Sequence, residues 1–119
     1  MPNPFGAPEV TVKAVAQKIE TGDAFIWLDV REPNELAMVA IDDSRVINVP
    51  LSQLAARGVD ALPAALRNQE AEIVVFCHHG MRSAQVTAWL RQQGWQQVVN
   101  MTGGIDAWAV EVDPAVGRY

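Results

Sequence analysis

The chain has 119 residues, half of them hydrophobic, and carries a formal net charge of −5 with a pI of about 4.8. This length suits one compact domain that needs no metal or disulfide for stability, and the ordinary composition excludes a disordered chain. The acidic balance argues against nucleic acid or an anionic membrane surface as a partner, because either would require clustered Lys and Arg.

The first half of the chain alternates helical and strand patterns. Apolar residues recur at helical spacing after Thr11, whereas residues 25–28 form a continuous apolar run of the kind found in strands buried on both faces. Pro33 is a residue type that opens helices. The expected elements are a helix between Thr11 and Gly22, a strand over 25–28, a short helix over 33–40 and a strand over 46–49.

The second half continues the alternation. The expected elements are one or two short helices within 51–68, a strand over 73–76, a helix over 83–93, a strand over 98–101 and a short helix over 106–109. No repeat or linker is visible, so we expect a single domain over 1–119, with its core at about 10–109 and an irregular tail over 110–119. Strands separated by helical crossovers predict an α/β fold with a parallel sheet and helices on both faces.

The cellular setting follows from the cysteine content and the apolar runs. The single cysteine, Cys77, excludes an internal disulfide and favours a reducing compartment. Residues 1–8 contain neither a basic cluster nor an apolar run, so we expect no secretory signal. The longest apolar runs fall far short of the roughly 20 residues of a membrane-spanning helix. We therefore expect a cytoplasmic protein, either a monomer or a weak dimer.

Two polar clusters follow predicted strands directly. One is 29–32, after the first strand, and the other begins at Cys77, after the strand over 73–76. Parallel sheets bind ligands beyond the carboxyl ends of their strands. These clusters are therefore the candidate functional site.

The segment Cys77–Ser83 carries the groups for nucleophilic chemistry. A loop of this length between a strand and a helix can turn its backbone N–H groups inward to form an anion-binding nest, and the helix N-terminus adds partial positive charge. Gly80 permits an unusual backbone angle, and Arg82 adds a cation. Cysteines in such surroundings favour the nucleophilic thiolate, so Cys77 is placed to attack a sulfur atom and to hold it as a persulfide.

The spacing within this loop bears on its chemistry. Cys77 and Arg82 form a C-x4-R pattern, whereas cysteine phosphatases use C-x5-R, a loop one residue longer that accepts a tetrahedral phosphoryl group. The shorter loop favours sulfur chemistry over phosphorus chemistry. A phosphatase or an arsenate reductase is the less favoured alternative.

Four segments in this order resemble the single-domain rhodanese family: 28–33 (LDVREP), 47–51 (INVPL), 77–84 (CHHGMRSA) and 101–108 (MTGGIDAW). The resemblance implies a five-stranded parallel sheet with flanking helices, and sulfur transfer through a Cys77 persulfide. One stretch departs from the family pattern. Residues 40–46 replace a turn similar to Gly-His-Ile-Pro-Gly-Ala, which bears on the pocket rim and on substrate preference.

The candidate site residues have distinct expected roles. Cys77 is the nucleophile, and the sulfur-binding loop consists of His78, His79, Gly80, Met81 and Arg82. The resemblance implies that Asp29 and Arg31 support this loop, and Ser83 is placed with them. Two histidines are too few for a closed zinc site, so we expect no metal and no cofactor.

Several other residues are expected to be structural. Glu35 is interpreted as an exposed helix residue. Gly103 and Gly104 are interpreted as turn residues with no ligand role. Three tryptophans are expected in the core: Trp27, Trp89 and Trp108.

The favoured function is an enzyme that moves a sulfane sulfur from thiosulfate, or another small anionic donor, to cyanide, a thiol or an acceptor protein. The alternative is a carrier whose Cys77 is loaded by one protein partner and discharged to another without turnover of small molecules. The absence of a second cysteine fits this alternative, because discharge must then be intermolecular.

Overall fold

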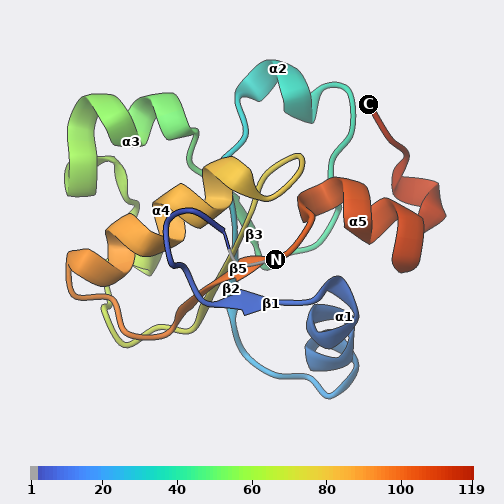
Figure 1. Cartoon of the computed structure of the whole chain (residues 1–119), viewed down its shortest axis with the longest axis horizontal. Coiled ribbons are helices and arrows are strands. Elements are labelled where there is room, and N and C mark those ends of the chain that lie inside the picture. Colours follow the sequence, from blue (N-terminus) through green and yellow to red (C-terminus); the bar gives the residue numbers. More distant parts are fainter. Residues whose placement is uncertain (1–2) are drawn as a thin grey trace.

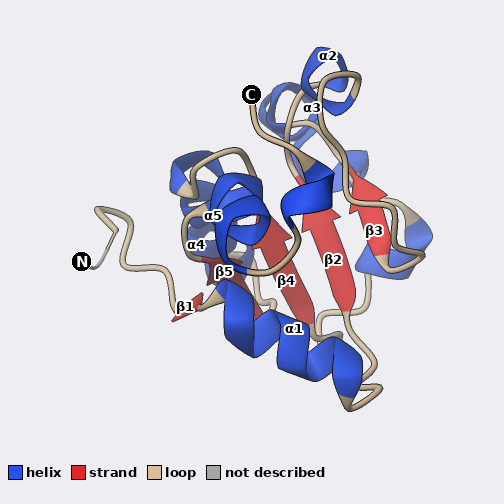
Figure 2. Ribbon diagram, turned by 90° about the vertical axis from the view of Figure 1, so that its right-hand side faces the viewer, coloured by secondary structure: helices blue, strands red, loops and turns tan. Residues whose placement is uncertain are grey.

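The computed structural model describes residues 3–119 and confirms the predicted α/β class, with a five-stranded sheet in which every strand pair is parallel. The strand order across the sheet is β1-β5-β4-β2-β3, and Figure 2 shows the strands side by side. The strands are β1 (Glu9–Val10), β2 (Ile26–Asp29), β3 (Val46–Asn48), β4 (Ile73–Phe76) and β5 (Val98–Met101).

Helices cover both faces of the sheet, as predicted. In Figure 1, α1 and α5 lie on one side of the sheet and α3 and α4 on the other, and α2 lies at the top of the view. The α-helices are α1 (Val12–Glu20), α2 (Pro33–Leu36), α3 (Leu51–Arg57), α4 (Met81–Gln92) and α5 (Gly104–Glu111). Short 3-10 helices are η1 (Gly58–Ala61), η2 (Ala64–Leu66) and η3 (Pro114–Val116).

The central strand β4 explains how the two layers are held. All four of its residues are buried, as the continuous apolar run predicted. Side chains alternate between the faces of a strand, so Val75 packs in the core beneath α3 and α4, while Val74 and Phe76 pack in the core beneath α1 and α5. The strand is therefore anchored on both sides, which fixes the position of the residue that follows it, Cys77.

The tryptophans expected in the core differ in burial. Trp27 and Trp108 are buried and in edge-to-face contact, with ring centroids 4.8 Å apart. Trp89 is half-buried and packs against the core from α4. Trp95, which the pattern did not single out, is buried, and its indole N–H donates to the Leu66 carbonyl at 2.9 Å.

Several predicted boundaries shift. The helix expected over 33–40 is the single turn α2, and beyond its end the Val39 carbonyl accepts a hydrogen bond from Arg31 Nη1 at 2.8 Å. The helix expected over 83–93 begins at Met81, two residues earlier, so Met81 and Arg82 form its first turn. The two-residue strand β1 was too short to produce an alternating pattern.

The segment after α5 is less irregular than expected. It contains η3, and its last residue, Tyr119, packs back toward the carboxyl ends of β2 and β4. Met1 and Pro2, which open the segment in which no secretory signal is expected, lie outside the described residues. None of the helices formed by residues 3–119 is both long enough and apolar enough to cross a membrane.

Candidate functional site

Cys77 stands directly after β4, at the carboxyl end of the sheet. The adjacent strand β2 ends at the same edge with Asp29, and the Val30 amide donates to the Phe76 carbonyl at 3.1 Å. The structure therefore brings the two predicted polar clusters together, because neighbouring parallel strands end side by side.

The sulfur atom of Cys77 receives three hydrogen bonds from the turn that follows it. The Gly80 amide lies 3.1 Å from Sγ, the Ser83 amide 3.4 Å and the Ser83 hydroxyl 3.3 Å. The cysteine itself is 1% exposed. These donors, together with the N-terminus of the twelve-residue helix α4, form a positive cradle suited to an anionic sulfur.

The carbonyls of the loop point away from this cradle and are held by other elements. The Ile105 amide donates to the Cys77 carbonyl at 2.8 Å, and the Asp106 amide donates to the His78 carbonyl at 3.1 Å. Asn100 Nδ2 on β5 donates to the Gly80 carbonyl at 3.1 Å. With its carbonyls fixed on one side, the loop presents amides to the sulfur on the other.

Gly104 is a supporting residue whose role the sequence interpretation missed. It opens α5 with φ of +62°, and a Cβ atom there would lie 2.4 Å from the Cys77 carbonyl oxygen and 2.6 Å from that of His78. Only glycine allows the start of α5 to approach the loop this closely. Its place beside another glycine, directly before a short helix, is the sequence signal for this close approach.

Gly80 also depends on being glycine. Its φ is +101°, a left-handed value that lets the chain turn from the loop into α4. A Cβ atom there would lie 3.0 Å from the Gly103 amide nitrogen. This agrees with the unusual backbone angle expected at this position.

Arg82 makes its contacts with Glu35 and so braces the loop against α2. Arg82 Nη1 donates to Glu35 Oε2 at 2.6 Å, and Nη2 donates to Oε1 at 2.7 Å. The prediction of an exposed Glu35 is wrong, since 14% of its side chain is exposed. The Arg82 guanidinium lowers the pKa of Glu35 to about 2, and Glu35 in turn raises the pKa of Arg82.

Asp29 and Arg31 form a buried ion pair beneath the loop. Arg31 Nη2 donates to Asp29 Oδ2 at 2.8 Å. The arginine side chain is 0% exposed and the aspartate side chain 2% exposed. The Arg31 guanidinium also lies over the rings of Phe76 and Tyr119. The pair therefore connects β2 to the residue that precedes Cys77.

The histidines and Met81 lie on the outer side of the loop. The His79 side chain is 66% exposed, with Nδ1 3.9 Å from Asp106 Oδ2, and Met81 is 56% exposed. His78 lies between the rings of His79 and Tyr119, with centroids at 3.9 and 3.8 Å. Burial lowers the pKa of His78 below its ordinary 6.5.

Tyr119 is a second residue that the sequence interpretation missed. Its hydroxyl lies 3.1 Å from both Arg31 Nη1 and Glu35 Oε1. No local pattern could have placed it there, because these partners lie far away in the sequence.

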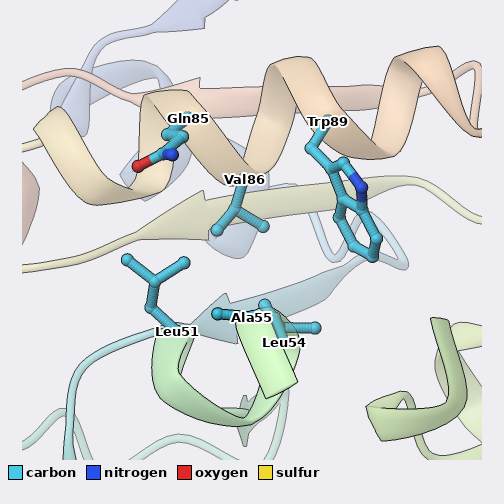
Figure 3. Close-up of a pocket in the computed structure, with 6 residues that line it drawn as sticks. All are labelled: Leu51, Leu54, Ala55, Gln85, Val86 and Trp89. Atoms are coloured by element: carbon cyan, nitrogen blue, oxygen red, sulfur yellow. The ribbon is translucent and has the colours of Figure 1, made fainter. Parts of the chain in front are cut away.

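Among the cavities that residues 3–119 form away from the loop, two differ in the side chains that line them. One, of about 170 Å³, lies between α3 and α4, and Figure 3 shows that apolar side chains from both helices converge on it. Its lining residues are Leu51, Leu54, Ala55, Gln85, Val86 and Trp89. The other, of about 400 Å³, is lined in part by Ala40, Ile41, Asp42 and Asp43. The stretch that departs from the family pattern therefore contributes to this second cavity.

Sequence comparison assigns most of the chain to one family. Residues 11–111 match the model of the rhodanese-like domain. The chain is 31% identical over 101 residues to a sulfurtransferase of Allochromatium vinosum, and the match covers 85% of this chain and 87% of that protein. It is 39% identical over 92 residues to the rhodanese-like/PpiC domain-containing protein 12 of Arabidopsis thaliana, described as chloroplastic. That match covers 77% of this chain but only 29% of the longer protein.

Comparison of structures agrees. The fold matches that of the human single-domain sulfurtransferase TSTD1 with a TM-score of 0.72 and 28% sequence identity. The match covers 89% of this chain and 98% of the human one. The two chains therefore share the fold over most of their length.

Proposed function

The chain belongs to the rhodanese-like family, and we propose that its Cys77 carries a sulfane sulfur, as a persulfide, from a small anionic donor such as thiosulfate to cyanide or a thiol. The observation that carries the proposal is the set of three donors aimed at Cys77 Sγ from Gly80 and Ser83. A buried cysteine that serves only as a small hydrophobic residue packs against apolar groups and does not require such donors.

In the first step, the Cys77 thiolate attacks the outer sulfur of thiosulfate. A bond forms between Sγ and that sulfur, the sulfur–sulfur bond of thiosulfate breaks, and sulfite leaves with the bonding electron pair. The product is Cys77–S–S⁻, whose charge equals that of the thiolate consumed. The Gly80 and Ser83 amides that contact Sγ, together with the N-terminus of α4, lie beside this anion and stabilise it.

In the second step, cyanide or a thiolate attacks the outer sulfur of the persulfide. The new bond forms to the acceptor, the bond to Sγ breaks, and the Cys77 thiolate is restored as thiocyanate or a new persulfide departs. No external oxidant or reductant is required. The same hydrogen-bond donors that held the persulfide then hold the leaving thiolate.

The burial of Cys77 imposes one requirement on this cycle. With only 1% of the residue exposed, a donor reaches Sγ only when part of the covering structure moves. The outer face of the loop, where His79 and Met81 are exposed, is the side from which a donor can approach.

The test is intact-mass analysis after exposure to thiosulfate. The wild-type chain is expected to gain the mass of one sulfur atom, and Cys77→Ser is expected to gain none while keeping its circular-dichroism spectrum. A Ser83→Ala variant, which keeps the thiol but loses the hydroxyl donor, is expected to load about three- to tenfold more slowly. Sulfur gain or retained thiocyanate formation in Cys77→Ser would overturn the proposal.

A carrier without small-molecule turnover is the second candidate, supported by the presence of a single cysteine. It differs from the enzyme in one measurable respect. A carrier would accept one sulfur from a protein persulfide, but would form thiocyanate from thiosulfate and cyanide at a negligible rate.

A further inference from the structure

The three arginines around the sulfur loop are each paired with a carboxylate within residues 3–119. The pairs, with their shortest N–O separations, are Arg82–Glu35 at 2.6 Å, Arg31–Asp29 at 2.8 Å and Arg118–Asp106 at 2.8 Å. Glu9, which accepts a hydrogen bond from Asn100 beside the loop, adds a further negative charge. His78 has a pKa lowered by burial, and His79 faces the Asp106 carboxylate.

The Arg82–Glu35 pair matters most, because Arg82 is the cation within the loop segment itself. Both terminal nitrogens of its guanidinium are engaged by the two Glu35 oxygens, at 2.6 and 2.7 Å. This is the bidentate geometry that an arginine would otherwise offer to an incoming anion. A doubly charged donor such as thiosulfate therefore meets the neutral Arg82–Glu35 pair. Without Glu35 it would meet an unpaired guanidinium.

The remaining positive charge at the loop comes from backbone dipoles. The N-terminus of α4 supplies the equivalent of roughly half an elementary charge, and the amides aimed at Sγ act at short range. This suffices to hold one negative charge on sulfur. It leaves the second charge of a dianion such as thiosulfate without a counter-charge.

We propose that Glu35 is a specificity-determining residue that, by occupying Arg82, directs the site toward persulfide donors with at most one charge at the reacting end and away from the thiosulfate dianion. The proposal rests on the proposed function of Cys77 and specifies its donor. The natural donor class is then a persulfide of a small thiol or of a protein cysteine.

The transfer from such a donor balances without a co-reactant. The Cys77 thiolate attacks the outer sulfur of R–S–SH, the bond from Sγ to that sulfur forms and the original sulfur–sulfur bond breaks. The thiolate R–S⁻ leaves with the electron pair, and the proton remains on the transferred sulfur. The donor brings no charge of its own in this reaction, whereas thiosulfate adds two negative charges beside a loop whose arginines are already paired.

The experiment compares kcat/KM for two donors, thiosulfate and 2-hydroxyethyl persulfide, in Glu35→Gln and Arg82→Gln. Glu35→Gln frees the guanidinium of its charged partner and is expected to raise the thiosulfate-to-persulfide ratio about tenfold at low salt. Arg82→Gln leaves the Glu35 carboxylate uncompensated and is expected to lower the ratio by about the same factor. Both changes should shrink at about 1 M salt, where the screening length is roughly 3 Å.

Opposite shifts in the two variants distinguish charge from scaffolding. If the pair only braced the loop, breaking it from either side would slow both donors in parallel and leave the ratio unchanged, which would overturn the proposal. The wild-type chain provides a test that needs no variant to fold. Its kcat/KM for thiosulfate should not fall as salt rises, and a fall would show a net attractive charge at the loop and overturn the proposal.

Two further variants complete the design. Glu20→Gln removes the same charge from the far end of α1 and is expected to leave the thiosulfate-to-persulfide ratio unchanged. A shift as large as that of Glu35→Gln would assign the effect to overall charge and overturn the proposal.

Cys77→Ser distinguishes a failure of the proposed function from a failure of the donor assignment. Turnover in Cys77→Ser would refute the proposed function, whereas an unchanged ratio in otherwise active Glu35 and Arg82 variants would refute only the assignment of donor class.

Discussion

The ring of Tyr119 lies parallel to the imidazole of His78, with centroids 3.8 Å apart and an angle of 8° between the planes. The tyrosine hydroxyl is hydrogen-bonded to Arg31 and to Glu35. One residue therefore links the sulfur loop to both ion pairs that support it. A disturbance at Tyr119 should be detectable at His78.

The first prediction concerns the titration of His78. Because burial is the main reason that its pKa is lowered, Tyr119→Ala should raise the His78 pKa toward the ordinary 6.5. Tyr119→Phe keeps the stacked ring and should change it much less. Histidine resonances followed by NMR against pH, with His79→Asn used to assign the two signals, measure this directly. An identical His78 pKa in wild type and Tyr119→Ala would show that the ring does not control its burial.

The second prediction concerns the contact between α5 and the loop. Gly104→Ala combines a left-handed backbone with a Cβ atom 2.4 Å from the Cys77 carbonyl oxygen, and should destabilise the fold by at least about 3 kcal/mol. Gly22→Ala is the matched control, since its φ is +75° and nothing lies within 4 Å of the added atom. It should cost only about 1 kcal/mol of backbone strain. Urea unfolding of both variants gives the comparison, and equal losses would mean that the close approach carries no cost.

Much of the fold was predictable because its signals are local. The strands over 73–76 and 98–101 were placed at their observed bounds, since continuous apolar runs between polar turns report burial within a few residues. Cys77 and the cluster at Asp29 were expected at one edge of the sheet from topology alone. The structure brings them to that edge.

What could not be predicted depends on contacts between distant segments. The sequence around Glu35 predicts a surface residue, because nothing near it signals Arg82, 47 positions away. Tyr119 lies in a segment with no periodic pattern, and its partners are 84 and 88 positions away. Side-chain pairing across a fold has no period, so residues that support the loop from afar are recognised only in three dimensions.

The third prediction uses two Asp-x-Arg motifs that differ in burial. In both, the aspartate accepts hydrogen bonds from the backbone amide and the guanidinium of the arginine two residues later. The Arg31–Asp29 side chains are 0% and 2% exposed, whereas those of Arg45–Asp43 are 27% and 20% exposed. Asp29→Ala leaves a buried guanidinium uncompensated and should cost about 3–5 kcal/mol.

The matched variant of the partly exposed motif, Asp43→Ala, should cost no more than about 1 kcal/mol, because water solvates the released arginine. Chemical denaturation of the two variants in parallel measures the difference. Equal losses in unfolding free energy would show that burial of the Asp29 pair does not determine its contribution.

The fourth prediction is a pH dependence of stability that originates at Glu35. Its pKa falls from the ordinary 4.5 to about 2 in the folded chain, chiefly through the hydrogen bonds from Arg82. A carboxylate whose pKa is lowered by folding stabilises the native state above its unfolded pKa, and this contribution is lost as the pH falls toward the folded value. Since the pair is only partly buried, solvent screening limits the contribution to about 1–2 kcal/mol at neutral pH.

Glu35→Gln has no carboxylate at this position, so its unfolding free energy should lie below that of the wild type by this amount at neutral pH. This difference in unfolding free energy should become smaller as the pH falls from 4.5 to about 2. Urea midpoints at neutral pH and at a pH of about 3 provide the two ends of this comparison. Glu20→Gln, which removes an exposed carboxylate on α1, should show no such narrowing. A gap that stays constant with pH would mean that Glu35→Gln acts through packing and not through the charge of the pair with Arg82.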